Sequence, residues 1–209
     1  MDWNVEAGKV LRRFLQTLSH NEEAWIFGSR FEMENQKNVG ICRTLLLEGL
    51  RFHSDSVPVY REYFMLEVAN LQNVQNEADN REEVEKCLEI LKMVFVKAVE
   101  ATNEPFFTVE LLGLCLHNEK LLQILKSALV EKFGETSSTW TVLATLELYQ
   151  PKRSASEKMQ AFSRTMAEGM NKVDNPEIKA DFARLLQQMS EAEPDLVSSI
   201  LPSFFNNLE

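Results

Sequence analysis

The chain has 209 residues, of which 44% are hydrophobic and 26% charged, a balance typical of a globular protein and unlike that of a disordered or collagen-like chain. Glycine and proline are scarce, with 7 and 6 residues, and this argues against a turn-rich all-β fold. The 22 basic and 32 acidic side chains give a net charge of −10. Because a mainly acidic surface repels the phosphate backbone of nucleic acids, direct binding of RNA or DNA is not the first expectation.

The sequence shows no pattern typical of catalysis, metal binding or membrane insertion. No apolar run approaches the roughly 18 residues that span a bilayer, and the first residues do not resemble a signal peptide. The histidines lack zinc-ligand spacing, and there is no glycine-rich phosphate loop. Cys42, Cys87 and Cys115 are far apart, so we expect reduced, packed thiols in a reducing compartment. We predict no catalytic residue, metal, cofactor, membrane contact or small-molecule substrate.

Apolar residues recur at spacings of three and four nearly from end to end, which predicts about eleven helices joined by short connections. In chain order, the clearest apolar stripes run over residues 10–18, 25–31, 45–50, 60–66, 91–98, 121–128 and 140–146. The polar stretch 72–81 has no such stripe, so it is either a long exposed helix end or a loop. The sequence therefore predicts an all-α protein.

One pattern recurs in the sequence: a large apolar residue, with further positions three, six and seven residues later. The first two copies are 35 residues apart. The three copies are Trp25, Gly28, Phe31 and Glu32; Tyr60, Tyr63, Leu66 and Glu67; and Trp140, Leu143, Leu146 and Glu147. We call the helices that carry this pattern A helices.

A second pattern alternates with the first, and we call its helices B helices. A large residue is followed after three positions by a small residue and then by another large one. The examples are Phe14 with Thr17-Leu18, Leu46 with Gly49-Leu50, Phe95 with Ala98-Val99, Leu125 with Ala128-Leu129, and Phe162 with Thr165-Met166. Because one helix pair cannot bury both of its apolar faces, this alternation predicts an α-solenoid of stacked antiparallel pairs.

The recurrent residues have expected roles in that fold. The small residue of a B helix lets a neighbouring helix approach, and the aromatic residue of the A helix fills the remaining gap. We expect the recurrent glutamates to be buried acceptors, with Arg43 a candidate partner of Glu32. Partner proteins would contact A-helix positions that the core does not need, although packing against the adjoining repeat is an equal alternative for the two phenylalanines. These positions are Phe27, Arg30, Arg61, Phe64 and Met65.

The two patterns resemble the half-a-tetratricopeptide (HAT) repeat, which implies a TPR-like right-handed superhelix. Cys42-Arg43 followed by Gly49-Leu50 matches the B helix of that repeat, whereas Leu47-Glu48 departs from its usual Glu-Arg. Leu50-Arg51-Phe52-His53 followed by Tyr60-Arg61-Glu62-Tyr63-Phe64 is similar to the U3 small nucleolar RNA-associated protein 6 family. That match covers residues 9–70; residues 82–149 fit further repeats, and residues 150–209 keep only helical periodicity. We expect one helical-repeat domain over 1–209.

The resemblance implies a non-enzymatic scaffold of the nucleolar small-subunit processome, which matures pre-18S ribosomal RNA. It implies protein partners from the U3 ribonucleoprotein, mainly indirect association with RNA, and a location in the nucleus and nucleolus. Because the chain opens on a B helix with no A helix before it, it resembles an internal piece or a shortened relative.

Two other functions stay open. A HAT-type adaptor in mRNA splicing or 3′-end processing would carry the same repeat. A TPR-like co-chaperone module would also be helical, but it would need a basic clamp for a terminal carboxylate, and the A helices have few aligned Lys or Arg residues.

Overall fold

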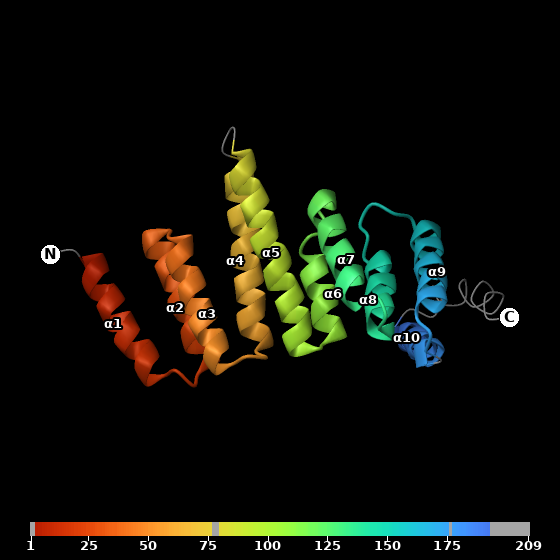
Figure 1. The fold of residues 1–209 in the computed structure, drawn as a ribbon, viewed down its shortest axis with the longest axis horizontal. Coiled ribbons are helices and arrows are strands. Elements are labelled where there is room, and N and C mark those ends of the chain that lie inside the picture. The colour runs from red at the N-terminus through yellow and green to blue at the C-terminus, as the bar shows by residue number, and fades with distance from the viewer. Residues whose placement is uncertain (1–2, 77–79, 176, 193–209) are drawn as a thin grey trace. The chain divides into compact units, whose positions relative to one another are not determined.

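The computed structural model describes residues 3–76, 80–175 and 177–192, which contain ten α-helices and no strand (Figure 1). The all-α prediction is confirmed, with ten helices in these residues where about eleven were expected. The helices are α1 (Trp3–Thr17), α2 (Glu22–Gln36), α3 (Val39–Phe52), α4 (Val57–Asn76), α5 (Arg81–Thr102), α6 (Pro105–Gly113), α7 (Glu119–Phe133), α8 (Ser137–Leu148), α9 (Ala155–Lys172) and α10 (Glu177–Ala192).

The chain divides into two compact units, Met1–Asn103 with α1 to α5 (unit 1) and Glu104–Glu209 with α6 to α10 (unit 2). In unit 1, α2 packs against α3 and α4 against α5, and α3 and α2 both contact α4. In unit 2, α8 packs against α9, while α6, α7 and α10 also contact α8. Packed helix pairs that follow one another along the chain are the arrangement expected of a helical repeat. One continuous array over both units stays a prediction.

Local sequence sets where these helices begin and end. Asn21 and Asn38 accept hydrogen bonds from the backbone of the first turns of α2 and α3, at 3.0 Å and 3.2 Å. Ser154 and Glu157 form a reciprocal capping box at the start of α9. Within the polar stretch 72–81, residues 72–76 are the end of a long helix, because α4 continues to Asn76, and α5 begins at Arg81.

Trp25 and Trp140 have matching surroundings, as the repeat predicts. Each indole Nε1 donates to the carbonyl oxygen six residues before it, at 3.0 Å for Trp25 and 2.8 Å for Trp140. Each ring lies against a glycine of the following B helix: a Cβ atom would lie 2.9 Å from Trp25 at Gly49 and 2.6 Å from Trp140 at Gly169. Only glycine permits such a close approach of helix backbone and indole.

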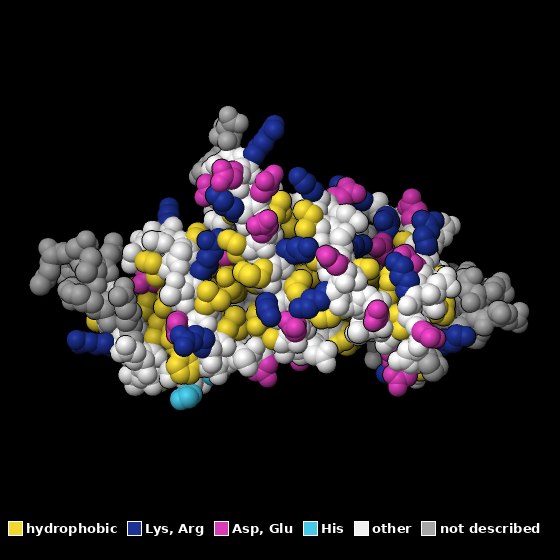
Figure 2. Space-filling view, in the orientation of Figure 1, with side chains coloured by type: hydrophobic (Ala, Val, Ile, Leu, Met, Phe, Trp, Pro, Cys, Tyr) yellow, Lys and Arg dark blue, Asp and Glu magenta, His cyan; other side chains and the backbone are white. Residues whose placement is uncertain are grey.

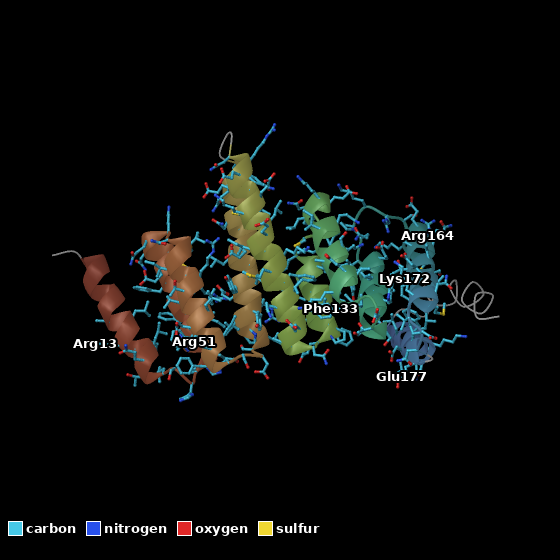
Figure 3. All side chains as sticks on the ribbon, viewed as in Figure 1. Arg13, Arg51, Phe133, Arg164, Lys172 and Glu177 are labelled. Carbon is cyan, nitrogen blue, oxygen red and sulfur yellow. The ribbon has the colours of Figure 1, made fainter. Side chains whose placement is uncertain are left out.

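The residue three positions after each glycine lies over the same indole ring. Phe52 stacks on Trp25 with ring centroids 5.8 Å apart, and Lys172 places its Nζ 5.1 Å from the Trp140 ring centroid (Lys172 is labelled in Figure 3). The sequence pattern predicted Thr165 as the small residue of α9. This prediction was wrong by one helical turn, because it is Gly169 that lies against Trp140.

The recurrent glutamates are buried acceptors, but one predicted pairing was wrong. Arg43 does not pair with Glu32; its guanidinium binds the fully buried Glu67 carboxylate through two bonds of 2.6 Å and 2.7 Å. The reason is that this side of α3 faces α4, the next A helix. Glu32 accepts instead from Gln36 Nε2 at 2.6 Å.

The third glutamate follows the arrangement seen at Glu67. Glu147 on α8 accepts from Lys126 Nζ on the preceding B helix at 2.6 Å, and it also pairs with Arg153. In both units, then, a basic side chain of one B helix neutralises a buried glutamate of the next A helix, which offsets the cost of burying the charge. Of the other repeat positions, Tyr60, Tyr63, Ala98, Ala128 and Leu146 are buried, and Phe31, Leu50 and Leu66 are half-buried.

Candidate protein-interaction surface

The outer faces of α2 and α4 are joined by an ion pair. Arg30 Nε and Nη2 donate to the two carboxylate oxygens of Glu62 at 2.9 Å and 2.6 Å. This hydrogen bond raises the pKa of Arg30 above its ordinary value. Because Arg30 is exposed, the pair contributes at most about 1 kcal/mol to stability. Its main effect is to fix the two charges at one place on the surface.

Exposed apolar side chains flank this ion pair on both helices. Phe27, 57% exposed, lies one turn before Arg30 on α2, and Met65, 47% exposed, lies one turn after Glu62 on α4. The Phe27 ring is held beside Phe31, with centroids 6.2 Å apart. We call Phe27, Arg30, Glu62 and Met65 the α2–α4 surface. Large apolar groups beside charged ones are typical of protein interfaces.

The structure separates the five predicted partner-binding residues. Phe27, Arg30 and Met65 are exposed and lie on the α2–α4 surface. Arg61 is half-buried and interacts with other groups of the chain. Phe64 is fully buried and packs against Phe95 with ring centroids 6.2 Å apart, so it belongs to the core and not to a partner surface. Phe64 is a packing residue, as the alternative expected, but it packs against α5 of its own helix pair and not against an adjoining repeat.

Sequence reasoning did not single out several other exposed apolar positions. On the B helices of unit 1, Leu47 and Met93 are exposed, and Figure 2 shows hydrophobic side chains among Lys and Arg where Figure 1 places α3 to α5. On α1 the exposed apolar residues are Val10, Phe14 and Leu18. No spacing in the sequence marks these positions as exposed, because their exposure depends on where the neighbouring helices pack.

Unit 2 contains a pocket of about 220 Å³ between α6, α8 and α10. Phe106, Val109 and Leu185 contribute apolar walls, and Phe106 is 72% exposed. Ser137 on α8 donates a hydrogen bond to Asp181 on α10, which holds the two helices together beside the pocket. The charged side chains that line the pocket are Asp181 and Arg184, which pair with each other at 3.1 Å.

The cysteines of the chain are buried and free, so the prediction of packed thiols is confirmed, whereas the reducing compartment stays a prediction. Burial raises the pKa of Cys115 to about 12 and raises those of Cys42 and Cys87 as well, so the thiols stay protonated at neutral pH. Among the residues that the structure describes, no group of three or more His, Cys, Asp or Glu side chains could hold a metal ion. Within that part of the chain, the helices are also too short or too polar to cross a membrane.

Comparison with known proteins supports the resemblance drawn from the repeat positions. The human U3 small nucleolar RNA-associated protein 6 homolog is 33% identical over 79 residues, which cover 38% of this chain. The chain resembles this family. The mouse homolog is 25% identical over 119 residues, or 51% of this chain. The matches span 13% of the human protein and 20% of the mouse protein, and no family model matches the sequence.

Proposed function

We propose that this chain is a non-enzymatic helical-repeat scaffold that holds protein partners in the nucleolar small-subunit processome during maturation of pre-18S ribosomal RNA. The observation that carries the proposal is the repeated contact between a tryptophan and the next B helix, at Trp25 on Gly49 and at Trp140 on Gly169, in a chain that resembles U3 small nucleolar RNA-associated protein 6. Stacked helix pairs of this kind present long surfaces for partners.

The α2–α4 surface is the proposed contact for a U3 ribonucleoprotein protein. Phe27 and Met65 supply exposed apolar area, and the Arg30–Glu62 pair supplies charges of both signs at a fixed position. A partner helix or extended segment with matching apolar residues would bury the side chains of Phe27 and Met65 and form hydrogen bonds to the Arg30–Glu62 pair. The net charge of −10 opposes direct binding of the RNA phosphate backbone, so partner proteins would mediate most of the association with RNA.

The proposal is tested by isolating the tagged chain from nuclear extract and measuring U3 small nucleolar RNA and its proteins in the bound fraction. We expect both to be recovered, and we expect the tagged chain to lie in nucleoli. The double variant Phe27→Glu, Met65→Glu should lose most of that recovery. Met93→Glu, which changes an equally exposed apolar side chain on α5, is the matched control.

Two results would overturn the assignment. Recovery of a splicing, 3′-end-processing or chaperone set without U3 components would contradict the assembly named here. Tight and steeply salt-dependent binding of the purified chain to pre-ribosomal RNA fragments, measured by calorimetry, would contradict the indirect association with RNA.

A further inference from the structure

The α2–α4 surface is part of a longer outward-facing stripe on α2. The exposed positions of this stripe follow spacings of four, three and four residues, which place them on one side of the helix. They are Glu23, Phe27, Arg30 and Glu34. On α4, Glu62 and Met65 also share one side, and the Arg30–Glu62 ion pair joins the two helices, which contact each other (Figure 1). The stripe on α2 and this side of α4 therefore form one face.

The charges of this face and of its margins are mostly negative. Among the exposed and half-buried side chains of α2 and α4, four are carboxylates and two are guanidinium groups. They are Glu22, Glu23, Glu34 and Glu62 against Arg30 and Arg61. Glu22 accepts a hydrogen bond from Ser56, and Glu62 is held by Arg30. Glu23 and Glu34 are therefore the two carboxylates that stay exposed on the same side of α2 as Phe27.

The stability of α2 does not explain the position of Glu34. This carboxylate lies in the last turn of the helix, which has no basic residue, and there it meets the negative end of the helix dipole. Glu23 lies in the first turn, where the dipole favours a carboxylate. A positive charge from outside the helix would relieve the unfavourable position of Glu34.

The spacing of the two carboxylates indicates the shape of a complementary partner. Glu23 and Glu34 are 34 − 23 = 11 residues apart, or about 16 Å along α2, with Phe27 and Arg30 between them. This distance is about three turns of a second helix lying along α2. An extended segment binds largely through main-chain hydrogen bonds to the open edge of a sheet, and no strand is present in the described residues. A helix is therefore the better match.

We propose that the occupant of the α2–α4 surface is a basic amphipathic helix of a partner protein. Its apolar side chains cover Phe27 and Met65, and its Lys or Arg residues, about three turns apart, pair with Glu23 and Glu34. This inference rests on the proposed function for the position of the contact, but it does not depend on the assembly named there.

The test uses two fluorescein-labelled probe peptides of about 18 residues, whose binding to the full chain is measured by fluorescence anisotropy. Both carry leucine on one helix face; one carries Lys and the other Glu at the flanking positions about three turns apart. Isolated helices of this length are only partly formed, and each protein variant is compared with the same peptide, so this cost is shared. We expect saturable binding of the basic peptide, at least about tenfold tighter than that of the acidic one.

Matched variants separate this face from the general attraction of an acidic protein for a basic peptide. Glu23→Gln, Glu34→Gln should weaken binding of the basic peptide at least about fivefold. Glu85→Gln, Glu89→Gln removes the same charge from exposed positions of α5 and should change it less than about twofold. The charge reversal Glu23→Lys, Glu34→Lys should make the acidic peptide bind more tightly than the basic one.

Two results of the peptide assay would overturn the inference. One is equal binding of the two peptides to the wild-type chain. The other is equal weakening by the pairs of variants on α2 and α5, because the net charge alone would then drive binding.

Recovery of U3 components from nuclear extract distinguishes this inference from the proposed function. If the wild-type chain recovers them and Glu23→Lys, Glu34→Lys recovers them equally well, the proposed function stands and the basic helix is wrong. If the peptides bind as expected but the wild-type chain recovers no U3 components, the basic helix stands and the assembly is wrong.

Discussion

Replacing Gly169 with alanine should destabilise unit 2, although alanine is the better helix former. A Cβ atom at Gly169 would lie 2.6 Å from Trp140 Cγ and 2.7 Å from Trp140 Cβ. The ring would have to retreat by about 0.8 Å to reach an ordinary contact of 3.4 Å. Its indole N–H is held by the Gly134 carbonyl at 2.8 Å, so the movement would also strain that hydrogen bond.

The expected magnitude follows from three opposing contributions. Overpacking of a core costs about 1–3 kcal/mol, and the weakened hydrogen bond about 1 kcal/mol. Replacing glycine inside a helix recovers about 1 kcal/mol. The net change is a loss of about 1–3 kcal/mol in the free energy of unfolding, which corresponds to about 5–150-fold in the unfolding equilibrium.

Gly113 on α6 is the matched control, because a Cβ atom there would meet nothing within 4 Å and its φ is not positive. Gly113→Ala should raise stability by about 0.5 kcal/mol. Stability is measured by urea denaturation with circular dichroism, and hydrogen exchange of α8 and α9 assigns the change to unit 2, because two compact units need not unfold in one transition. If Gly169→Ala is as stable as Gly113→Ala, the Trp140–Gly169 contact is not as tight as described.

Arg43→Met should lower the free energy of unfolding by about 3 kcal/mol and speed hydrogen exchange in α3 and α4, because it leaves the buried Glu67 carboxylate unpaired. The double variant Arg43→Met, Glu67→Met should recover most of this loss. A double variant less stable than the single one would contradict the explanation. Lys126→Met should cost less, about 1 kcal/mol in the same urea assay, because Glu147 keeps Arg153. Since burial holds the pKa of Cys115 at about 12, its thiol stays protonated below that pH. Iodoacetamide at pH 8 should therefore alkylate Cys115 only after denaturation, because the thiolate is the reactive form. Rapid alkylation of the folded chain, detected by mass spectrometry, would refute this.

The periodic features of this protein could be predicted from sequence because they depend on residues close together in the chain. Spacings of three and four place apolar residues on one side of a helix wherever that helix lies. The all-α fold, the matching positions of Trp25 and Trp140, the small residue at Gly49 and the buried glutamates all follow from such spacings. The same positions carried the resemblance to U3 small nucleolar RNA-associated protein 6.

Which neighbour each side chain meets was decided by the tertiary structure. α9 offers two small–large pairs on one side, Thr165-Met166 and Gly169-Met170, and only the depth at which Trp140 sits selects the second. Arg43 could reach either flanking A helix by sequence, but the side of α3 it lies on faces α4. These choices depend on how helices pack across distances that local periodicity does not encode.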